Sequence, residues 1–291
     1  MTYRYTPWWL PVALILSLLM CAGLFATLVL RTPKAVSATT DQQNGTTTEI
    51  YRWRLVTTWP KKFPGLGLAP ENFAELLNKM SSGRIQITVY GANEIVPAMG
   101  VFDAVSSGSV EMGHGAAYYW KGKIPASSFF TAIPFGMNAT EFNGWLHYGG
   151  GLEMWREIYA PFDLIPFAGG NTGVQMGGWF NREIKSIADF KGLKMRIPGY
   201  AGEIFTRAGG TAVNIPGGEL YTALQSGVID ATEWVGPYND RAFGFQQIAK
   251  YYYYPGWQEP TEMVEKVSGY DHMVMINEAN RNVGRPEPFT Q

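Results

Sequence analysis

Short strand-like and helix-like segments alternate along the chain, and this alternation restricts the fold more than any other feature. Residues 50–57 (IYRWRLVT) and 84–90 (RIQITVY) alternate apolar with polar side chains and are rich in β-branched residues, which is typical of strands. Between them, residues 69–81 (APENFAELLNKMS) repeat apolar residues at helical spacing. The buried face of that helix should consist of Phe73, Leu76, Leu77 and Met80. A helix at 101–107 and a strand at 111–114 continue the rhythm, which predicts an α/β domain with a mostly parallel sheet.

The second half of the chain repeats this rhythm. Strands are expected at residues 174–181, 193–197, 212–215 and 229–234. A helical turn is expected at 187–190, and helices at 199–208 and 218–226. Two α/β modules in one chain predict two lobes with a cleft between them, and such clefts are preferred places for ligands.

The N-terminus carries an export signal. Trp8–Leu30 is almost entirely apolar, is flanked by basic residues and is long enough to span a bilayer. Val36 and Ala38 fit the −3 and −1 positions of a cleavage site. Residues 1–38 are therefore either a signal peptide or a membrane anchor through 8–30, and residues 39–48 form a polar linker. In both cases we expect the rest of the chain in the periplasm.

Composition excludes several classes of function. The formal net charge is −1, which argues against a nucleic-acid partner. The one cysteine, Cys21, lies in the export signal, so the exported part has no disulfide, thiol nucleophile or cysteine-bound metal. The chain contains no P-loop, dinucleotide-binding, HExxH or GxSxG motif. Its histidines, His114, His147 and His272, lack the spacing of metal ligands.

Several longer segments carry a family resemblance. They are TWPKKFPGL (58–66), NEIVPAMGVFDAVSSGSVEMGHGAAYYWKGK (93–123), FFTAIPFGM (129–137), GVQMGGWF (173–180), IKSIADFKGLKMRIPG (184–199), GGELYTALQSGVIDATEWVGP (217–237) and AKYYYYPGWQEP (249–260). In this order they resemble the solute-binding proteins of tripartite ATP-independent periplasmic (TRAP) transporters. The Glu-Trp pair at 233–234 resembles the branch that binds 2-oxo acids and related monocarboxylates with a cation.

The resemblance implies a two-lobed periplasmic-binding-protein-like fold that captures a ligand and is not an enzyme. The ligand would be a small monocarboxylate, either a 2-oxo acid such as pyruvate or a 2-hydroxy acid, which the protein delivers to membrane permease subunits. A homodimer is compatible with it. We expect lobe I at 49–170, with 235–260 returning to it, and lobe II at 171–234. Residues 261–291 depart from the family's usual Gly-Thr segment and helical layer, although 261–279 can form a helix.

Arg196 and Gln175 are the expected ligands of the substrate. Arg196 ends an apolar strand, where a guanidinium can bind a carboxylate through two parallel hydrogen bonds, or can pair with an acidic residue at the surface. Gln175 lies in an apolar, glycine-rich segment and must either be fully hydrogen-bonded or face water at an edge. The resemblance implies that Arg196 clamps the substrate carboxylate and that Gln175 contacts both ligand and cation.

Glu233 is the expected centre of a cation site. It follows an apolar strand and needs a counter-charge, which Arg196 could supply were it not committed to the substrate. A hard cation such as Na⁺ or Ca²⁺ would resolve this conflict. The resemblance implies side-chain oxygens from Glu233 and Glu259, with Gln258 in place of Glu259 as the second choice, and a backbone oxygen from Trp234. The ion would bridge protein and ligand.

Aromatic residues should form the walls of the site. Trp59, Tyr118 and Tyr119 follow strands, and their positions suit either a pocket wall or ordinary core packing. The tyrosine hydroxyls could bond an oxo or hydroxyl group of the substrate. The run at 251–254 is better explained as a buried strand than as a binding surface.

Two other functions are compatible with the same residues. A membrane-anchored ligand sensor or scaffold would keep residues 8–30 as its anchor. An exported metal-dependent hydrolase would use Glu233 and His114, but it would need a base next to a metal-bound water, and no sequence spacing supports that.

Overall fold

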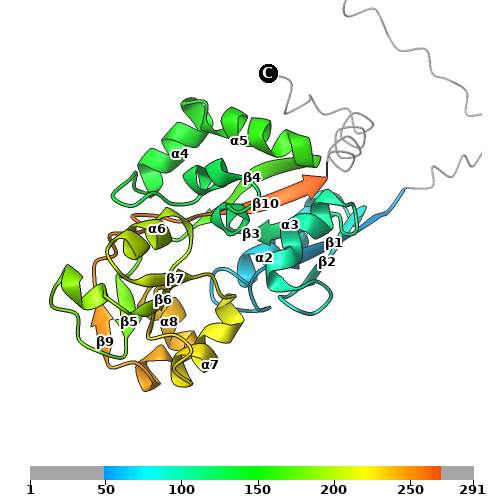
Figure 1. Ribbon diagram of the computed structural model, residues 1–291. Coiled ribbons are helices and arrows are strands. Elements are labelled where there is room, and N and C mark those ends of the chain that lie inside the picture. The colour runs from blue at the N-terminus through cyan, green and yellow to red at the C-terminus, as the bar shows by residue number, and fades with distance from the viewer. Residues whose placement is uncertain (1–48, 270–291) are drawn as a thin grey trace, which may run out of the picture. The chain divides into compact units, whose positions relative to one another are not determined.

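The computed structural model describes residues 49–269, which form two five-stranded sheets (Figure 1). The first sheet has the order β2-β1-β3-β10-β4 and the second β7-β6-β8-β5-β9. The strands of the first are β1 (Tyr51–Thr57), β2 (Ile85–Tyr90), β3 (Met112–Gly115), β4 (Leu164–Asn171) and β10 (Met263–Gly269). Those of the second are β5 (Gly178–Phe180), β6 (Lys194–Arg196), β7 (Thr211–Val213), β8 (Ala231–Thr232) and β9 (Tyr251–Tyr253). The predicted two-lobed α/β fold is confirmed.

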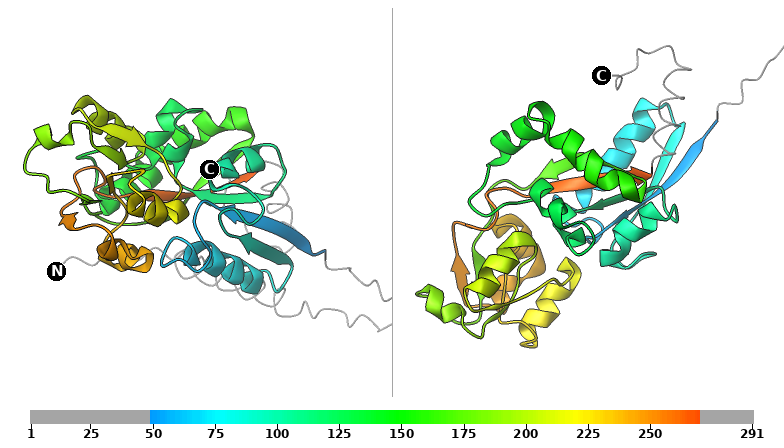
Figure 2. Two further views of the ribbon diagram at one scale, coloured as in Figure 1. Left: turned by 60° about the horizontal axis from the view of Figure 1, so that its bottom comes forward. Right: turned by 45° about the horizontal axis from the view of Figure 1, so that its top comes forward.

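Helices cover both faces of each sheet (Figures 1 and 2). The α-helices are α2 (Leu68–Met80), α3 (Val101–Ser106), α4 (Ala139–Tyr148), α5 (Gly151–Tyr159), α6 (Gly199–Arg207), α7 (Leu220–Gln225) and α8 (Pro237–Phe243). The 3₁₀ turns are η1 (Ala98–Gly100), η2 (Ala117–Trp120), η3 (Pro125–Phe130), η4 (Ala160–Phe162), η5 (Ile187–Phe190), η6 (Gly217–Glu219) and η7 (Phe245–Gln247). In β1, Leu55 packs with α2 while the next residue, Val56, packs with α3 on the opposite face, as the two-residue period of a strand requires.

The two sheets share one pattern of strand directions. In each, four strands run in one direction and the strand next to one edge, β10 or β5, runs in the other. Each of these reversed strands is the first that follows a passage of the chain from one sheet to the other. The expectation of mostly parallel sheets is thus met, with one reversed strand in each.

Two segments carry the chain between the sheets, 172–177 and 254–262, and we call them the crossing segments. They are bonded to each other, since the backbone N–H of Gln175 donates to Glu259 O at 3.1 Å and that of Gly256 to Gln175 O at 2.9 Å. The predicted return of residues 235–260 to lobe I is wrong, because β9 pairs with β5 in the second sheet. The return is made by β10, which lies between β3 and β4.

Strand β10 replaces the start of the helix expected at 261–279. Its Glu265 is fully buried and accepts hydrogen bonds from Trp120 Nε1 and from the Tyr159 hydroxyl, the latter at 2.8 Å. These donors come from η2 and α5. Because they satisfy the buried carboxyl group, a segment with charged residues such as 261–268 can form a central strand. Residues 270–279 of that expected helix, the export signal at 1–38 and the linker at 39–48 lie outside the described residues.

Other expected elements are present but shorter or turned differently. Helix α2 buries Pro70 and Ala74, while Leu76 and Met80 of the expected face are 57% and 62% exposed. The strand expected at 174–181 is limited to Gly178–Phe180, which leaves Gln175 on a crossing segment. Strand β9 is confirmed, but its tyrosines are only half-buried. Within residues 49–269, no helix is both long and apolar enough to cross a bilayer.

The buried carboxyl of Glu265 should make stability depend on pH. Burial raises its pKa from 4.5 to about 7, so the folded state binds this proton more tightly than the unfolded chain does. Its stabilising contribution is present below pH 4.5 and is lost as the pH rises through about 7. At roughly 1.4 kcal/mol per unit, the difference in unfolding free energy between wild type and Glu265→Gln should change by about 3 kcal/mol across this window. Urea unfolding between pH 4.5 and 8 measures it, and parallel curves for the two proteins would contradict it.

Candidate functional site

A buried ion pair lies at the carboxyl ends of two neighbouring parallel strands. Arg196 ends β6 and Glu233 follows β8, and the register that pairs Arg196 with Thr232 brings the two side chains together. Both are 1% exposed, and Arg196 Nη1 donates to Glu233 Oε1. Burial raises the pKa of Glu233 to about 7 although the guanidinium opposes the shift. Burial also disfavours the charge on Arg196, but the Glu233 carboxylate and the two tyrosines Tyr118 and Tyr119 together outweigh it, and the pKa of Arg196 is raised.

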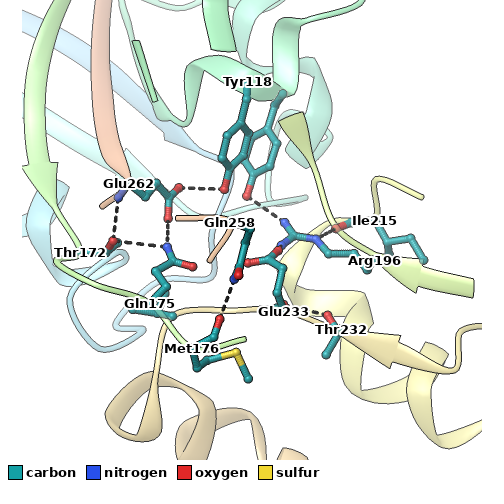
Figure 3. Close-up of polar contacts among 12 residues, drawn as sticks. Tyr118, Thr172, Gln175, Met176, Arg196, Ile215, Thr232, Glu233, Gln258 and Glu262 are labelled. Atoms are coloured by element: carbon teal, nitrogen blue, oxygen red, sulfur yellow. Dashed lines mark hydrogen bonds and ion pairs between the residues drawn. The ribbon is translucent and has the colours of Figure 1, made fainter. Parts of the chain in front are cut away.

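The guanidinium of Arg196 also joins the two lobes. Its Nε donates to the backbone oxygen of Ile215 at 3.2 Å, and Nη2 donates to the Tyr119 hydroxyl at 3.1 Å (Figure 3). Tyr119 belongs to η2 of lobe I, so this bond connects the sheets. The Trp234 ring lies 5.2 Å from the guanidinium carbon, within cation–π range. Because each terminal nitrogen carries a second N–H, Arg196 retains donors for a further acceptor.

Three buried side chains on the crossing segments have an oxygen without a hydrogen-bond partner among the described residues. They are Gln175 Oε1, Gln258 Oε1 and Glu259 Oε2. Burial raises the pKa of Glu259 well above its usual value, and the nearby carboxylates of Glu233 and Glu262 add to this effect. Carboxylate and amide oxygens are the donors that Na⁺ and Ca²⁺ take, so this set fits a hard cation. Residues 49–269 hold no cluster of three or more His, Cys, Asp or Glu side chains placed for a metal.

Glu262 belongs to the same site, although it was not among the site residues predicted from the sequence. It is buried and accepts hydrogen bonds from the Tyr118 hydroxyl at 3.1 Å and from Gln175 Nε2 at 2.8 Å (Figure 3). The bond to Glu262 uses the hydrogen of Tyr118, which was expected to serve the substrate. The Tyr119 hydroxyl accepts a hydrogen bond from Arg196. Its own hydrogen is therefore still available to a ligand. Nothing in the local pattern of 261–268 marks Glu262, because its partners are far away in the sequence.

The aromatic residues that were expected to form the walls of the site lie together. Trp59, Tyr118, Tyr119 and Trp234 line the same small space as Arg196, Glu233 and Glu262. The space between their atoms is about 170 Å³, and no water-sized sphere fits in it. Trp59 also packs edge-on against His114, with ring centroids 5.1 Å apart. An acid could therefore reach Arg196 only if these side chains or the lobes move.

A groove lies next to the two tyrosines and is lined by residues of both lobes. Its volume is about 490 Å³, and Tyr118 and Tyr119 line both this groove and the inner space. Two polar contacts join the lobes near this groove. Lys121 pairs with Glu203 on α6, and the Tyr200 hydroxyl donates to the backbone oxygen of Pro125 at 3.1 Å.

The structure changes two of the expectations for this site. Arg196 was expected to be committed to the substrate and unavailable to Glu233, but the two side chains are in direct contact. The hydrolase interpretation required His114 as a base beside Glu233. His114 is instead fully buried, its Nδ1 is hydrogen-bonded to Glu265 O at 2.8 Å, and burial lowers its pKa to about 3, so it is a poor base near neutral pH.

The fold and site define a two-lobed binding protein, and comparison with known proteins identifies its family. Residues 55–279 match the family described as bacterial extracellular solute-binding protein, family 7, and the chain belongs to this family. Its members are solute-binding proteins of transporters and not enzymes.

Three relatives carry more specific descriptions. A monocarboxylate 2-oxoacid-binding periplasmic protein of Nostoc sp. is 49% identical over 230 residues, which are 79% of this chain and 61% of the relative. The chain thus spans about three fifths of that protein's length. A TRAP periplasmic solute-binding protein from Pseudoalteromonas atlantica, solved with sodium and pyruvate, is 48% identical, with a TM-score of 0.78 over 81% of this chain and 71% of that one. One from Colwellia psychrerythraea, solved with calcium and pyruvate, is 47% identical, with a TM-score of 0.77 and the same coverage.

Two adjacent glycines test the packing of Trp234. A Cβ added at Gly217 would lie 2.4 Å from the Trp234 ring, whereas one at Gly218 would meet its first neighbour at 3.8 Å. Neither glycine has a positive φ, so the backbone accepts alanine at both positions. Gly217→Ala should lower the unfolding free energy by about 1–3 kcal/mol, as overpacking does. Gly218→Ala should stay within about 0.5 kcal/mol of wild type. Urea unfolding measures both, and equal effects would contradict the close packing.

Proposed function

We propose that this chain is the extracytoplasmic solute-binding protein of a TRAP transporter and captures a 2-oxo monocarboxylate such as pyruvate, or a 2-hydroxy acid, together with Na⁺ or Ca²⁺. The observation that carries the proposal is Arg196, a buried guanidinium between the lobes with N–H groups still available on both terminal nitrogens. Such a pair of donors matches the two oxygens of a carboxylate. Tyr119 can donate its hydroxyl hydrogen to the neighbouring oxo or hydroxyl oxygen of the acid.

The contact between Arg196 and Glu233 links the acid to the cation. The side chains that line the site or the lobes have to move before an acid can reach the guanidinium, because the space around the ion pair admits no water-sized sphere. A bound cation would supply positive charge to the Glu233 carboxylate and to the acid. Gln175, Gln258, Glu259 and the Trp234 carbonyl are the proposed partners of Glu233 in holding it. The relatives solved with pyruvate and either sodium or calcium support this assignment.

Capture and delivery follow from the two lobes. The lobes close on the acid as a shift of population toward the state that binds it better, and the closed protein docks on the membrane permease. We propose that residues 1–38 direct export of the chain to the periplasm. If residues 8–30 were kept as a membrane anchor, the protein would instead be a membrane-anchored sensor. N-terminal sequencing of the exported protein separates the two forms, since cleavage after Ala38 would begin the mature chain at Thr39.

Replacing Arg196 tests the carboxylate site. Arg196→Lys should weaken pyruvate binding by about 2–5 kcal/mol, because an ammonium cannot reproduce the planar pair of donors and leaves Glu233 poorly matched. Arg241→Lys, on the exposed face of α8, is the control and should bind like wild type. Calorimetry measures both, with thermal unfolding to confirm that each variant folds. Affinity within about twofold of wild type for Arg196→Lys would rule out the clamp.

Coupling between acid and cation tests the bridging ion. Each ligand should tighten the other by the same factor, with about 1–3 kcal/mol of coupling. Glu233→Gln should lose most of it, because a neutral amide is a weaker ligand for a hard cation. The measurement is a titration of pyruvate into chelator-treated protein in choline buffer, then with Na⁺ or Ca²⁺ added. Equal affinity in all buffers for the wild type would mean that no ion bridges protein and acid.

A further inference from the structure

Glu262 is held firmly in place on its crossing segment. Its backbone N–H donates to Thr172 Oγ1 at 3.0 Å, and the Thr172 N–H donates to the Glu262 carbonyl oxygen, also at 3.0 Å. Its carboxylate spans Tyr118 of lobe I and Gln175 of the other crossing segment. The side chain therefore has little freedom, and its two oxygens have one protein donor each.

Glu262 decides which way the Gln175 amide is turned. The oxygen and nitrogen of an amide have nearly the same shape, but an ionised carboxylate only accepts hydrogen bonds. The NH₂ of Gln175 must therefore face Glu262, and it donates to Glu262 Oε2 at 2.8 Å and to Thr172 Oγ1 at 3.3 Å. Both of its hydrogens are used, so Oε1 faces the opposite side. Figure 3 shows this oxygen pointing toward Gln258, and it has no partner within residues 49–269.

We infer that Glu262 is a positioning residue that keeps the Gln175 carbonyl oxygen, and not its NH₂, turned toward the cation site. This inference rests on the proposed function. A flipped amide would present two N–H groups where the ion needs an oxygen and would repel it. The residue acts through Gln175 and does not itself touch the cation.

Hydrogen bonding alone would not require a carboxylate at this position. A glutamine at 262 could accept from Gln175 or donate to it, and it could pair with the Tyr118 hydroxyl in either role. It would also avoid burying a charge close to Glu233 and Glu259. What a glutamine cannot do is force Gln175 into one orientation. The functional consequence of the carboxylate is thus the fixed direction of one carbonyl oxygen.

A double-mutant cycle on the full chain tests this inference. Pyruvate affinity is measured by calorimetry with and without Ca²⁺ in wild type, Glu262→Gln, Gln175→Ala and the double variant, and the ratio of the two affinities is the readout. We expect Glu262→Gln to lower the ratio by roughly tenfold, about as far as Gln175→Ala does, and to have no further effect when Gln175 is already absent. A merely structural role would not produce this dependence on Gln175.

Glu265→Gln is the matched control, since Glu265 is a buried carboxylate three residues further along with partners only in lobe I. It should leave the ratio unchanged. Two outcomes would overturn the inference while the proposed function stands. One is a ratio for Glu262→Gln equal to that of wild type. The other is that Glu262→Gln lowers the ratio as much in the Gln175→Ala background as it does in wild type. A wild-type ratio of one would overturn both. If Glu262→Gln does not fold, Glu262→Asp, which shortens the side chain by one methylene and withdraws the carboxylate from Gln175, should lower the ratio in the same direction. An unchanged ratio there would overturn the inference.

Discussion

The buried contact between Arg196 and Glu233 is the interaction on which the site depends. A guanidinium taken out of water is tolerated only with a carboxylate close to it, and the parallel pairing of β6 with β8 supplies one at the next strand end. The same guanidinium reaches Tyr119 across the boundary between the lobes. One buried positive charge therefore fixes both the position of the site and a polar link between the sheets.

Three buried carboxyl groups surround the one guanidinium of Arg196, and each has different partners. Glu233 balances the guanidinium, Glu262 orders Gln175 and Tyr118, and Glu259 keeps an oxygen without a partner. Glu265, in β10, is separated from this group and is satisfied by Trp120 and Tyr159. Between 259 and 265, similar acidic residues thus belong to the candidate site in one case and to the core of lobe I in another, and only their distant partners distinguish them.

The sequence predicted most of what depends on local pattern. The strands up to β3, the alternation in the second half and the placement of Arg196 and Glu233 at strand ends all follow from short-range periodicity. It did not predict β10, because the charges of Glu265 and Lys266 resemble an exposed helix. Their hydrogen-bond partners, among them the Gly169 carbonyl that accepts from Lys266 at 2.9 Å, lie about a hundred residues away or further. Glu262 and the orientation of Gln175 were missed for the same reason.

Under the proposed function, the location of the three oxygens without a partner has a kinetic consequence. Gln175, Gln258 and Glu259 all lie on the crossing segments, which are bonded to each other, whereas Arg196 and Tyr119 belong to opposite lobes. Groups at a hinge change their mutual distances least when two lobes swing apart, and groups far from it separate most. The oxygens would therefore remain together in an open protein in which the carboxylate clamp is split. This geometry favours a fixed order of association, with the ion arriving first and the acid second, and it makes the acid the ligand whose arrival registers as closure.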